Sequence, residues 1–318
     1  MKKRTLFALL AAMTALILDS RCAAQSAREA LSLCARTLVP SLFPLFVLGG
    51  MLVPVLAGIR IAGLNRLLGF PGGYFLLGAL GGYPMGAACI AQAVDRGDLS
   101  KEEAARMMGL CSLCGPSFLF GVVGAMLSLR DAAAVFLLQM GAALLTAAFW
   151  PGAVAGSRSP ASEPVSLPDA LNRAVGSILS VCGWVTMAAV AAGFLRRWLF
   201  PFLPDGAGIL LTGLMELSNG IAAAQGMPYE MQFVLSALFC SFGGLSVLLQ
   251  IAGLAKGIGM GQCIGQKSVH GLLTAVLALL WNRFGLISLF LIPAALFAKI
   301  AVEIPGYMVY NVRRKEGI

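Results

Sequence analysis

Leu210-Leu-Thr-Gly-Leu-Met-Glu-Leu-Ser-Asn-Gly-Ile-Ala-Ala-Ala224 is an apolar run that holds one carboxylate, Glu216, and a Ser-Asn-Gly break shortly after it. A carboxylate at the centre of a bilayer costs at least ~2.5 kcal/mol, so it usually faces a cavity or a partner. A helix break at that depth persists only where protein or a cavity covers it, because lipid cannot satisfy its backbone groups. The stretch predicts a polar internal site at Glu216, which could couple to protons. The alternative is a carboxylate near the interface that reaches toward the headgroups.

The composition of the whole chain places this stretch in a membrane protein. Of 318 residues, 59% are hydrophobic and 12% are charged, against roughly 25% charged in a soluble domain. This excludes a soluble enzyme, a disordered tail and a disulfide scaffold, and it predicts an all-α polytopic membrane protein. The net charge of +9 lies in short clusters at the ends of apolar runs. We therefore expect membrane lipid as a partner and no nucleic acid.

Residues for enzyme or metal chemistry are scarce. Cys111 and Cys114 form a Cys-x-x-Cys with apolar, glycine-rich flanks and no second pair nearby. We interpret the pair as small-residue packing, and metal or redox chemistry is the alternative. His270 is the one histidine, so a His-rich metal site is impossible. With no metal-ligand cluster and no nucleophile beside a base, we expect no enzyme, no metal and no cofactor.

The chain divides into two halves around one linker. Three pieces of the first half recur in order in the second: Gly81 to Gln92 beside Met215 to Gln225, Cys111-Ser beside Cys240-Ser, and Leu144-Leu-Thr-Ala beside Leu272-Leu-Thr-Ala. The separation along the chain between the two partners is nearly the same in all three pairs. Three pairs in register indicate a duplication.

We expect five segments from this pattern. They are residues 1–37, a leading transmembrane helix and loop; 38–150, the first repeat; 151–167, the linker; 168–284, the second repeat; and 285–318, a trailing helix and basic tail. Residues 1–22 also resemble a signal peptide, and we favour an uncleaved span because many spans follow.

The topology follows if the glycine-interrupted run of each half enters and leaves the membrane on one side. Each half then crosses three times, which inverts the second half and gives about eight transmembrane helices plus two re-entrant hairpins. With the N-terminus inside, fifteen Lys and Arg residues lie inside, Lys267 among them, and seven lie outside. The positive-inside rule favours this orientation. Were the interrupted runs full spans, each half would cross four times without inverting.

A mixed-charge run from Asp95 to Arg106 follows the first interrupted segment. Ser100 and Glu103 within it have the spacing of a capping box, in which each side chain accepts from the other residue's backbone N–H. The run therefore predicts a short solvated helix and no functional site.

Four breaks in two matched pairs predict a central cavity lined from both halves. Free helix N-termini would direct partial positive charge toward it and attract an anionic group. The alternative is glycine that serves only helix packing. The expected breaks are Gly82, Pro84, Gly86, Gly115, Pro116, Gly220, Gly243 and Gly244. The expected solute-binding residues are Tyr83, Ser117, Glu216, Asn219, Phe242 and Ser246.

Several motifs together resemble a known family. Pro40-Ser-Leu-Phe-Pro-Leu-Phe46, Gly81-Gly-Tyr-Pro-Met-Gly86, the Cys-Gly-Pro-Ser break and Glu216-Leu-Ser-Asn-Gly220 resemble the YlbJ-type sporulation integral membrane proteins of the nucleoside-recognition, or Gate, domain families. The resemblance covers roughly residues 5–310. It implies two inverted Gate-type repeats and a bacterial cell membrane protein, integral and multi-pass, that acts in spore formation at the outer forespore membrane.

A more distant similarity is to concentrative nucleoside transporters. Phe242-Gly-Gly-Leu-Ser-Val-Leu-Leu-Gln-Ile-Ala-Gly253 is similar to a segment of theirs, and Glu216 would match an acidic residue that contacts the nucleoside sugar. Their first hairpin carries a polar set where this chain has Gly82, Tyr83 and Pro84, and Gly244 stands in place of their asparagine.

These resemblances imply a transporter of a small solute by alternating access at a midplane site. The solute would be an anion such as dipicolinate, or a nucleoside-like compound. The alternative function is a non-transporting membrane scaffold required for sporulation. The sequence leaves the oligomeric state, the coupling ion and the direction of transport open.

Overall fold

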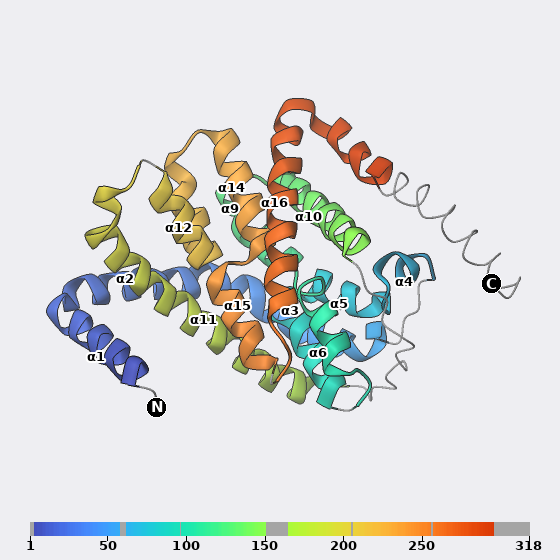
Figure 1. Ribbon diagram of the computed structural model, residues 1–318, viewed down its shortest axis with the longest axis horizontal. Coiled ribbons are helices and arrows are strands. Elements are labelled where there is room, and N and C mark those ends of the chain that lie inside the picture. Colours follow the sequence, from blue (N-terminus) through green and yellow to red (C-terminus); the bar gives the residue numbers. More distant parts are fainter. Residues whose placement is uncertain are drawn as a thin grey trace, which may run out of the picture.

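The structure is a computed structural model and describes residues 3–57, 62–95, 97–150, 165–204, 206–255 and 257–295. Within these ranges every regular element is a helix (Figure 1). Each backbone group inside a helix bonds within the same segment, which is what a membrane interior demands. The all-α class is confirmed for the described residues.

Four helices of the described chain are long and apolar enough to cross a membrane. They are α10 (Leu129–Phe149), α11 (Leu167–Trp198), the run Tyr229–Leu254 and the run Gly261–Ala295. The run Tyr229–Leu254 contains α14 (Tyr229–Phe242) and α15 (Gly244–Leu254), and Gly261–Ala295 begins with α16 (Gly261–Phe284) and η5 (Gly285–Phe290). These helices are consistent with a membrane-embedded protein, and about eight spans stays a prediction.

The N-terminal segment differs from the expected helix and loop. Helices α1 (Lys3–Leu18) and α2 (Ser20–Leu33) meet at Asp19 with a bend of 90°. A π-turn, η1 (Cys34–Leu38), then leads directly into α3 (Val39–Ala57), so residues 20–37 are helical. At the bend, the Asp19 carboxylate lies 2.9 Å from the Arg197 guanidinium at the end of α11 and forms an ion pair with it.

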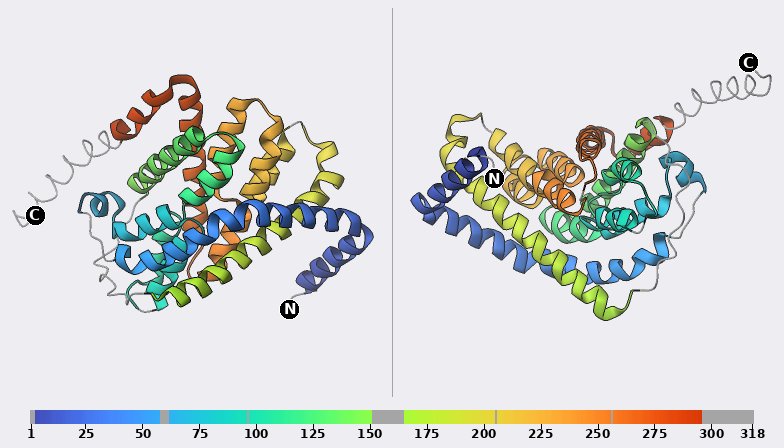
Figure 2. Two further views of the ribbon diagram at one scale, coloured as in Figure 1. Left: turned by 180° about the vertical axis from the view of Figure 1, so that it is seen from behind. Right: turned by 60° about the horizontal axis from the view of Figure 1, so that its bottom comes forward.

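Helix α11 is the long tilted element of the structure, and it crosses one side of the helical body (Figure 2). Helices α2 and α3 pack along it. Gly193 allows the contact with α2, because a Cβ there would lie 2.2 Å from the Ser26 hydroxyl. The side chain of Ser166 caps the start of α11 by accepting from the Asp169 N–H. Residues 151–164 of the expected linker lie outside the described residues, as do residues 296–318 of the expected trailing segment.

Two pairs of short helices form hairpins. Helices α5 (Gly72–Gly81) and α6 (Met85–Asp95) join at Gly82, Tyr83 and Pro84, and α12 (Ala207–Met215) joins α13 (Leu217–Ala223) at Glu216. None of the four reaches the ~20 residues that a membrane crossing needs. Each pair is therefore two short helices joined by a turn, and their re-entrant placement in a membrane stays a prediction.

Glycines bring the two helices of each hairpin together. A Cβ on Gly86 would lie 3.0 Å from the Cα of Gly78, and a Cβ on Gly220 would lie 2.1 Å from the Cα of Gly213. Gly86 and Gly220 were expected at breaks, but they lie inside α6 and α13. Their physical role is close backbone approach, for which glycine is used as readily as for a break.

The remaining elements connect the hairpins to the long helices. Helix α4 (Ala62–Leu68) precedes the first hairpin, and α7 (Lys101–Met108) follows it with the predicted capping box of Ser100 and Glu103 in place. The first broken segment, residues 109–127, follows and contains α8 (Pro116–Phe118), η2 (Leu119–Val123) and α9 (Gly124–Met126). Two 3-10 turns, η3 (Phe200–Phe202) and η4 (Ala224–Gly226), flank the second hairpin. Helix α16 runs through the body and packs on α10 and α14 (Figure 1).

Candidate functional site

The tip of the first hairpin meets the break in the segment after it. Gly82 has a φ of +71°, and a Cβ there would lie 2.9 Å from the Gly115 nitrogen. In the opposite direction, a Cβ on Gly115 would lie 2.8 Å from the Gly82 Cα. Pro116 follows as the first residue of α8, where a helix needs no N–H. We call this backbone contact the first junction.

The second half makes the same kind of contact. Gly243 and Gly244, with φ values of +87° and +78°, separate α14 from α15. A Cβ on Gly244 would lie 3.1 Å from the Met215 carbonyl oxygen and 3.2 Å from the Glu216 Cα, at the tip of the second hairpin. This is the second junction. Glu216 aligns with Gly82, and Gly244 aligns with Gly115, in the same registers as the paired pieces of sequence.

Glu216 caps the helix that follows it. Its Oε2 accepts from the Asn219 N–H at 2.7 Å, and its Oε1 accepts from the Ser218 hydroxyl at 3.0 Å. The side chain is 2% exposed. A carboxylate at this position satisfies an unpaired N–H and opposes the positive end of the helix dipole. Both oxygens therefore have partners within α13.

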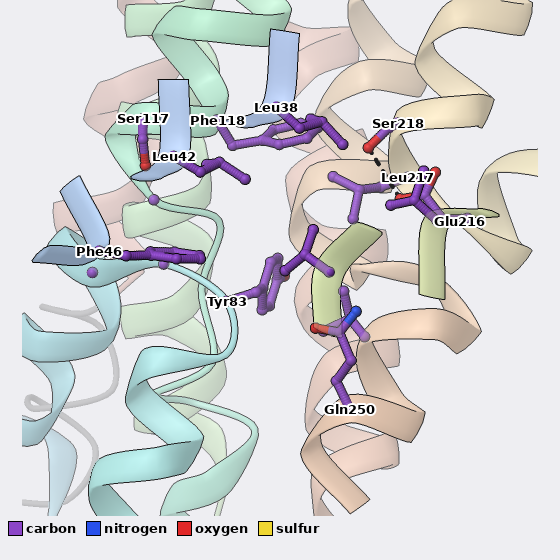
Figure 3. Close-up of a pocket in the computed structure, with 16 residues that line it drawn as sticks. Leu38, Leu42, Phe46, Tyr83, Ser117, Phe118, Glu216, Leu217, Ser218 and Gln250 are labelled. Carbon is purple, nitrogen blue, oxygen red and sulfur yellow. Dashed lines mark hydrogen bonds between the residues drawn. The ribbon is translucent and has the colours of Figure 1, made fainter. Parts of the chain in front are cut away.

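A small cavity of about 40 Å³ lies between the two junctions (Figure 3). Three of the expected binding residues, Tyr83, Ser117 and Glu216, line it together. Apolar side chains form most of the remaining wall, among them Leu38, Leu42, Phe46, Phe118 and Leu217. Figure 3 shows the wall built from both halves, with Tyr83 and Ser117 on one side and Glu216, Ser218 and Gln250 on the other.

The other three expected residues lie elsewhere. The Asn219 side chain donates to the Val185 carbonyl at 3.5 Å, which joins α13 to α11. Phe242 packs on α16, where a Cβ on Gly271 would lie 3.0 Å from its Cβ. Ser246 is buried in α15 and is not among the lining residues of either cavity.

A larger cavity of about 500 Å³ adjoins the small one and shares Phe46 and Gln250 with it. Helices α6, α11 and α15 form its walls, and its polar side chains include Gln92, Arg173, Ser177, Ser180 and Gln250. Among the described residues that line it, Arg173 is the one charged side chain, and none is a carboxylate. Gln250 is 8% exposed, and its side-chain oxygen has no hydrogen-bond partner in the described part of the chain. A polar group at the boundary of the two cavities is thus left unsatisfied there.

Lys267 is the residue that sequence reasoning missed. It was counted as an inner loop charge, yet it is 0% exposed inside α16. Its ammonium donates to the Tyr83 hydroxyl at 2.6 Å and to the Ser112 carbonyl at 2.8 Å. The Tyr83 hydroxyl in turn donates to the Cys240 carbonyl at 2.9 Å. The chain of bonds joins the first hairpin, the first broken segment and α14.

A signal for Lys267 was present in the register of the proposed repeat. The register that aligns Leu144 with Leu272 also aligns Gln139 with Lys267. Gln139 lies in α10, and its amide donates to the Cys114 carbonyl at 2.7 Å. Both side chains therefore satisfy carbonyls of the first broken segment, one from each half.

The Cys-x-x-Cys segment packs against the first hairpin. Both thiols are buried and free. A Cβ on Gly78 or Gly86 would lie 1.7 or 1.8 Å from the Cys111 carbonyl oxygen, so this backbone lies directly on the hairpin helices. Among the residues that the structure describes, no group of three or more His, Cys, Asp or Glu side chains is placed to hold a metal ion.

Comparison with known proteins gives no match, since neither a protein-family model, a curated protein nor a solved structure matches this chain.

Proposed function

We propose that the chain is an integral membrane transporter of a small solute, which binds between two inverted repeats and crosses by movement of one repeat against the other. The observation that carries this proposal is the pair of matched junctions. In each half a hairpin tip touches the broken segment that follows it, and the small cavity lies between the two contacts. Broken helices around a cavity are the arrangement by which many transporters bind their solute.

The proposed topology treats α5–α6 and α12–α13 as re-entrant hairpins and the halves as inverted Gate-type repeats with about eight spans in all. Support comes from the shared register of the paired sequences and from the short helices of each hairpin. The two halves meet through the hydrogen bond from Tyr83 to Cys240, where alternating access would require a change.

An anion is the solute class that the larger cavity favours. Arg173 supplies one positive charge, and the amides of Gln92 and Gln250 and the Ser180 hydroxyl supply hydrogen-bond donors, whereas the Ser177 hydroxyl donates to the Arg173 carbonyl at 2.9 Å. None of the described lining residues is a carboxylate that would oppose an anion. The aromatic side chains of Phe46 and Trp184 suit a flat ring. This supports a small aromatic anion such as dipicolinate over a neutral nucleoside. Action in spore formation at a bacterial membrane rests on the family resemblance alone.

Efflux from proteoliposomes tests the proposal. The purified protein is reconstituted, and the release of trapped radiolabelled dipicolinate or uridine is followed against protein-free vesicles. We expect release of the anion, with Arg173→Gln reducing it at least tenfold and Arg173→Lys retaining part of it, since the charge remains. Arg283→Gln is the matched control, because Arg283 lies in the last turn of α16, outside both cavity linings.

The opposite result would favour the scaffold. If neither solute crosses the membrane, and changes in residues 95–107 abolish spore formation while Arg173→Gln leaves it intact, the transporter proposal fails.

A further inference from the structure

The buried ammonium of Lys267 has no acidic partner among the described residues. Its acceptors are both uncharged, the Tyr83 hydroxyl and the Ser112 carbonyl, and it also lies 4.7 Å from the centre of the Tyr83 ring. An unpaired buried charge is expensive, so evolution of a stable fold would favour a neutral side chain at this place. Gln139, its counterpart in the first half, is such a neutral side chain.

The bond geometry gives the charge a specific consequence. An ammonium has three donor hydrogens and no acceptor, so the Tyr83 oxygen must accept from it. The Tyr83 hydrogen is then free to point at α14, where the Cys240 carbonyl lies at 2.9 Å and the Ser241 carbonyl at 3.3 Å. The charged lysine therefore holds the tip of the first hairpin on a helix of the second half.

A neutral amine allows the direction of one bond to reverse. It has a lone pair that can accept the Tyr83 hydrogen at the same 2.6 Å separation. Tyr83 would then donate to Lys267 and lose its bond to Cys240. The contact between the halves would weaken without a change in covalent structure.

We propose that Lys267 binds and releases one proton, and that this proton decides whether the Tyr83 hydroxyl ties the first hairpin to the second half. On release, an N–H bond of the ammonium breaks as its proton passes to the Tyr83 oxygen, and the proton that Tyr83 carried before leaves to solvent through the small cavity, which Tyr83 lines and Lys267 does not. On uptake, the tie between Tyr83 and Cys240 forms again. In the proposed transporter the proton is thus the coupling ion, and Lys267 takes the coupling role first considered for Glu216.

The other titratable groups around Lys267 are thiols, a hydroxyl and an imidazole. Cys114 faces it from the first broken segment, Cys240 from α14, and Cys263 and His270 from α16 itself, in addition to Tyr83. Helix α10 presents the Gln139 carbonyl to His270, and α7 presents the Arg106 carbonyl to Gln266. Glu216 is committed to its helix cap.

Hydrogen–deuterium exchange tests the switch without any solute. The full chain is studied in nanodiscs at pH 6 and pH 9, and protection of residues 78–86 and 239–246 is corrected for the intrinsic pH dependence of exchange. In the wild type we expect protection at pH 9 to be lower by a factor of about 3 to 10, the change for one net hydrogen bond. Lys267→Met should give low protection at both pH values, and Lys267→Arg, which stays charged, should give high protection at both.

Two further variants complete the test. Gln139→Met is the matched control, because it removes the equivalent bond to Cys114. We expect lower protection in this variant, with the ratio of protection at pH 6 to protection at pH 9 (the pH ratio) unchanged. Tyr83→Phe keeps the lysine and should abolish the pH ratio, which covers the case that Lys267→Met does not fold. The proposal is overturned if the wild type shows no pH ratio, or if the ratio persists in Lys267→Arg or Tyr83→Phe.

The exchange result and the efflux result separate the two proposals. A pH ratio that depends on Lys267, without release of either solute, would leave the proton switch standing and remove the transporter. Release of solute with no pH ratio would leave the transporter standing and remove the proton switch.

Discussion

At both junctions a hairpin tip contacts the broken segment that follows it, but the backbone and the polar groups differ. The positive φ lies at the tip, Gly82, in the first junction and in the broken segment, at Gly243 and Gly244, in the second. At the first junction the carbonyls of Ser112 and Cys114 receive donors from long helices, Lys267 on α16 and Gln139 on α10. At the second junction Glu216 accepts from its own helix through Ser218 and Asn219. The first junction therefore receives side-chain donors from both halves. At the second, the Glu216 carboxylate is satisfied within its own hairpin, while the Cys240 carbonyl accepts from Tyr83 of the first half. The two halves thus share a contact between hairpin tip and break, and they differ in which groups satisfy the polar atoms around it.

The largest expected effect is at the glycine contact of the first junction. Gly82→Ala adds a Cβ 2.9 Å from backbone at a φ of +71°, and we expect a loss of about 3 to 4 kcal/mol of unfolding free energy. Gly244→Ala, at a φ of +78° and 3.1 Å, should cost about 2 kcal/mol. The measurement is unfolding in mixed micelles titrated with SDS. Gly253→Ala is the control, since a Cβ there meets no described atom within 4 Å. Equal losses of unfolding free energy at Gly82 and Gly244 would show that the two backbone contacts are equally close.

The second prediction concerns the donors of the first junction. Gln139→Met leaves the buried Cys114 carbonyl without its 2.7 Å donor, and we expect a loss of about 1 to 3 kcal/mol in the same unfolding assay. Exchange protection should fall at residues 112–119 and stay unchanged at residues 213–220. An equal fall at both places would mean that Gln139 supports the second junction as well as the first.

The third prediction concerns the cap of the second junction. Glu216→Ala removes both acceptors of α13 and should cost about 1 to 2 kcal/mol. Glu216→Gln keeps an acceptor for the Asn219 N–H and should cost less. Protection of residues 217–223 measures the cap directly. If Glu216→Gln is as damaging as Glu216→Ala, the charge matters more than the hydrogen bond.

The smallest effect is expected far from both junctions. Arg197→Gln removes the ion pair with Asp19, whose arginine is 64% exposed, and such pairs contribute about 0 to 1 kcal/mol. The unfolding midpoint should shift little, and solute release should be unchanged. A shift as large as that of Gln139→Met would show that the bend between α1 and α2 is coupled to the junctions.

Local sequence signals predicted the local structure well. Gly82, Pro84, Gly115, Pro116, Gly243 and Gly244 lie at breaks, and the capping box of Ser100 and Glu103 is present. These outcomes depend on the conformational range of glycine and proline and on short spacings, which the sequence states directly.

Contacts between helices that are distant in the sequence could not be predicted in the same way, because they depend on how the helices align in space. Glycine serves helix breaks and helix contacts alike, so Gly86 and Gly220 could not be assigned to packing before α6 and α13 were known. Lys267 looked like a loop charge because its partners, Tyr83 and Ser112, belong to the other half of the sequence. Only the register that aligns it with Gln139 connected it to the first junction.

The contact between Gly82 and Gly115 also has a consequence for how this chain can vary and be traced. Two backbones touch there with no side chain between them, so a substitution at either position meets the other before it meets anything flexible. Neither position can be substituted without a change at the other. The two glycines therefore form a motif of fixed spacing in a chain whose apolar composition makes sequence comparison less specific. Distant relatives could be sought by that paired spacing, together with the turn at Gly243 and Gly244, where overall similarity has faded.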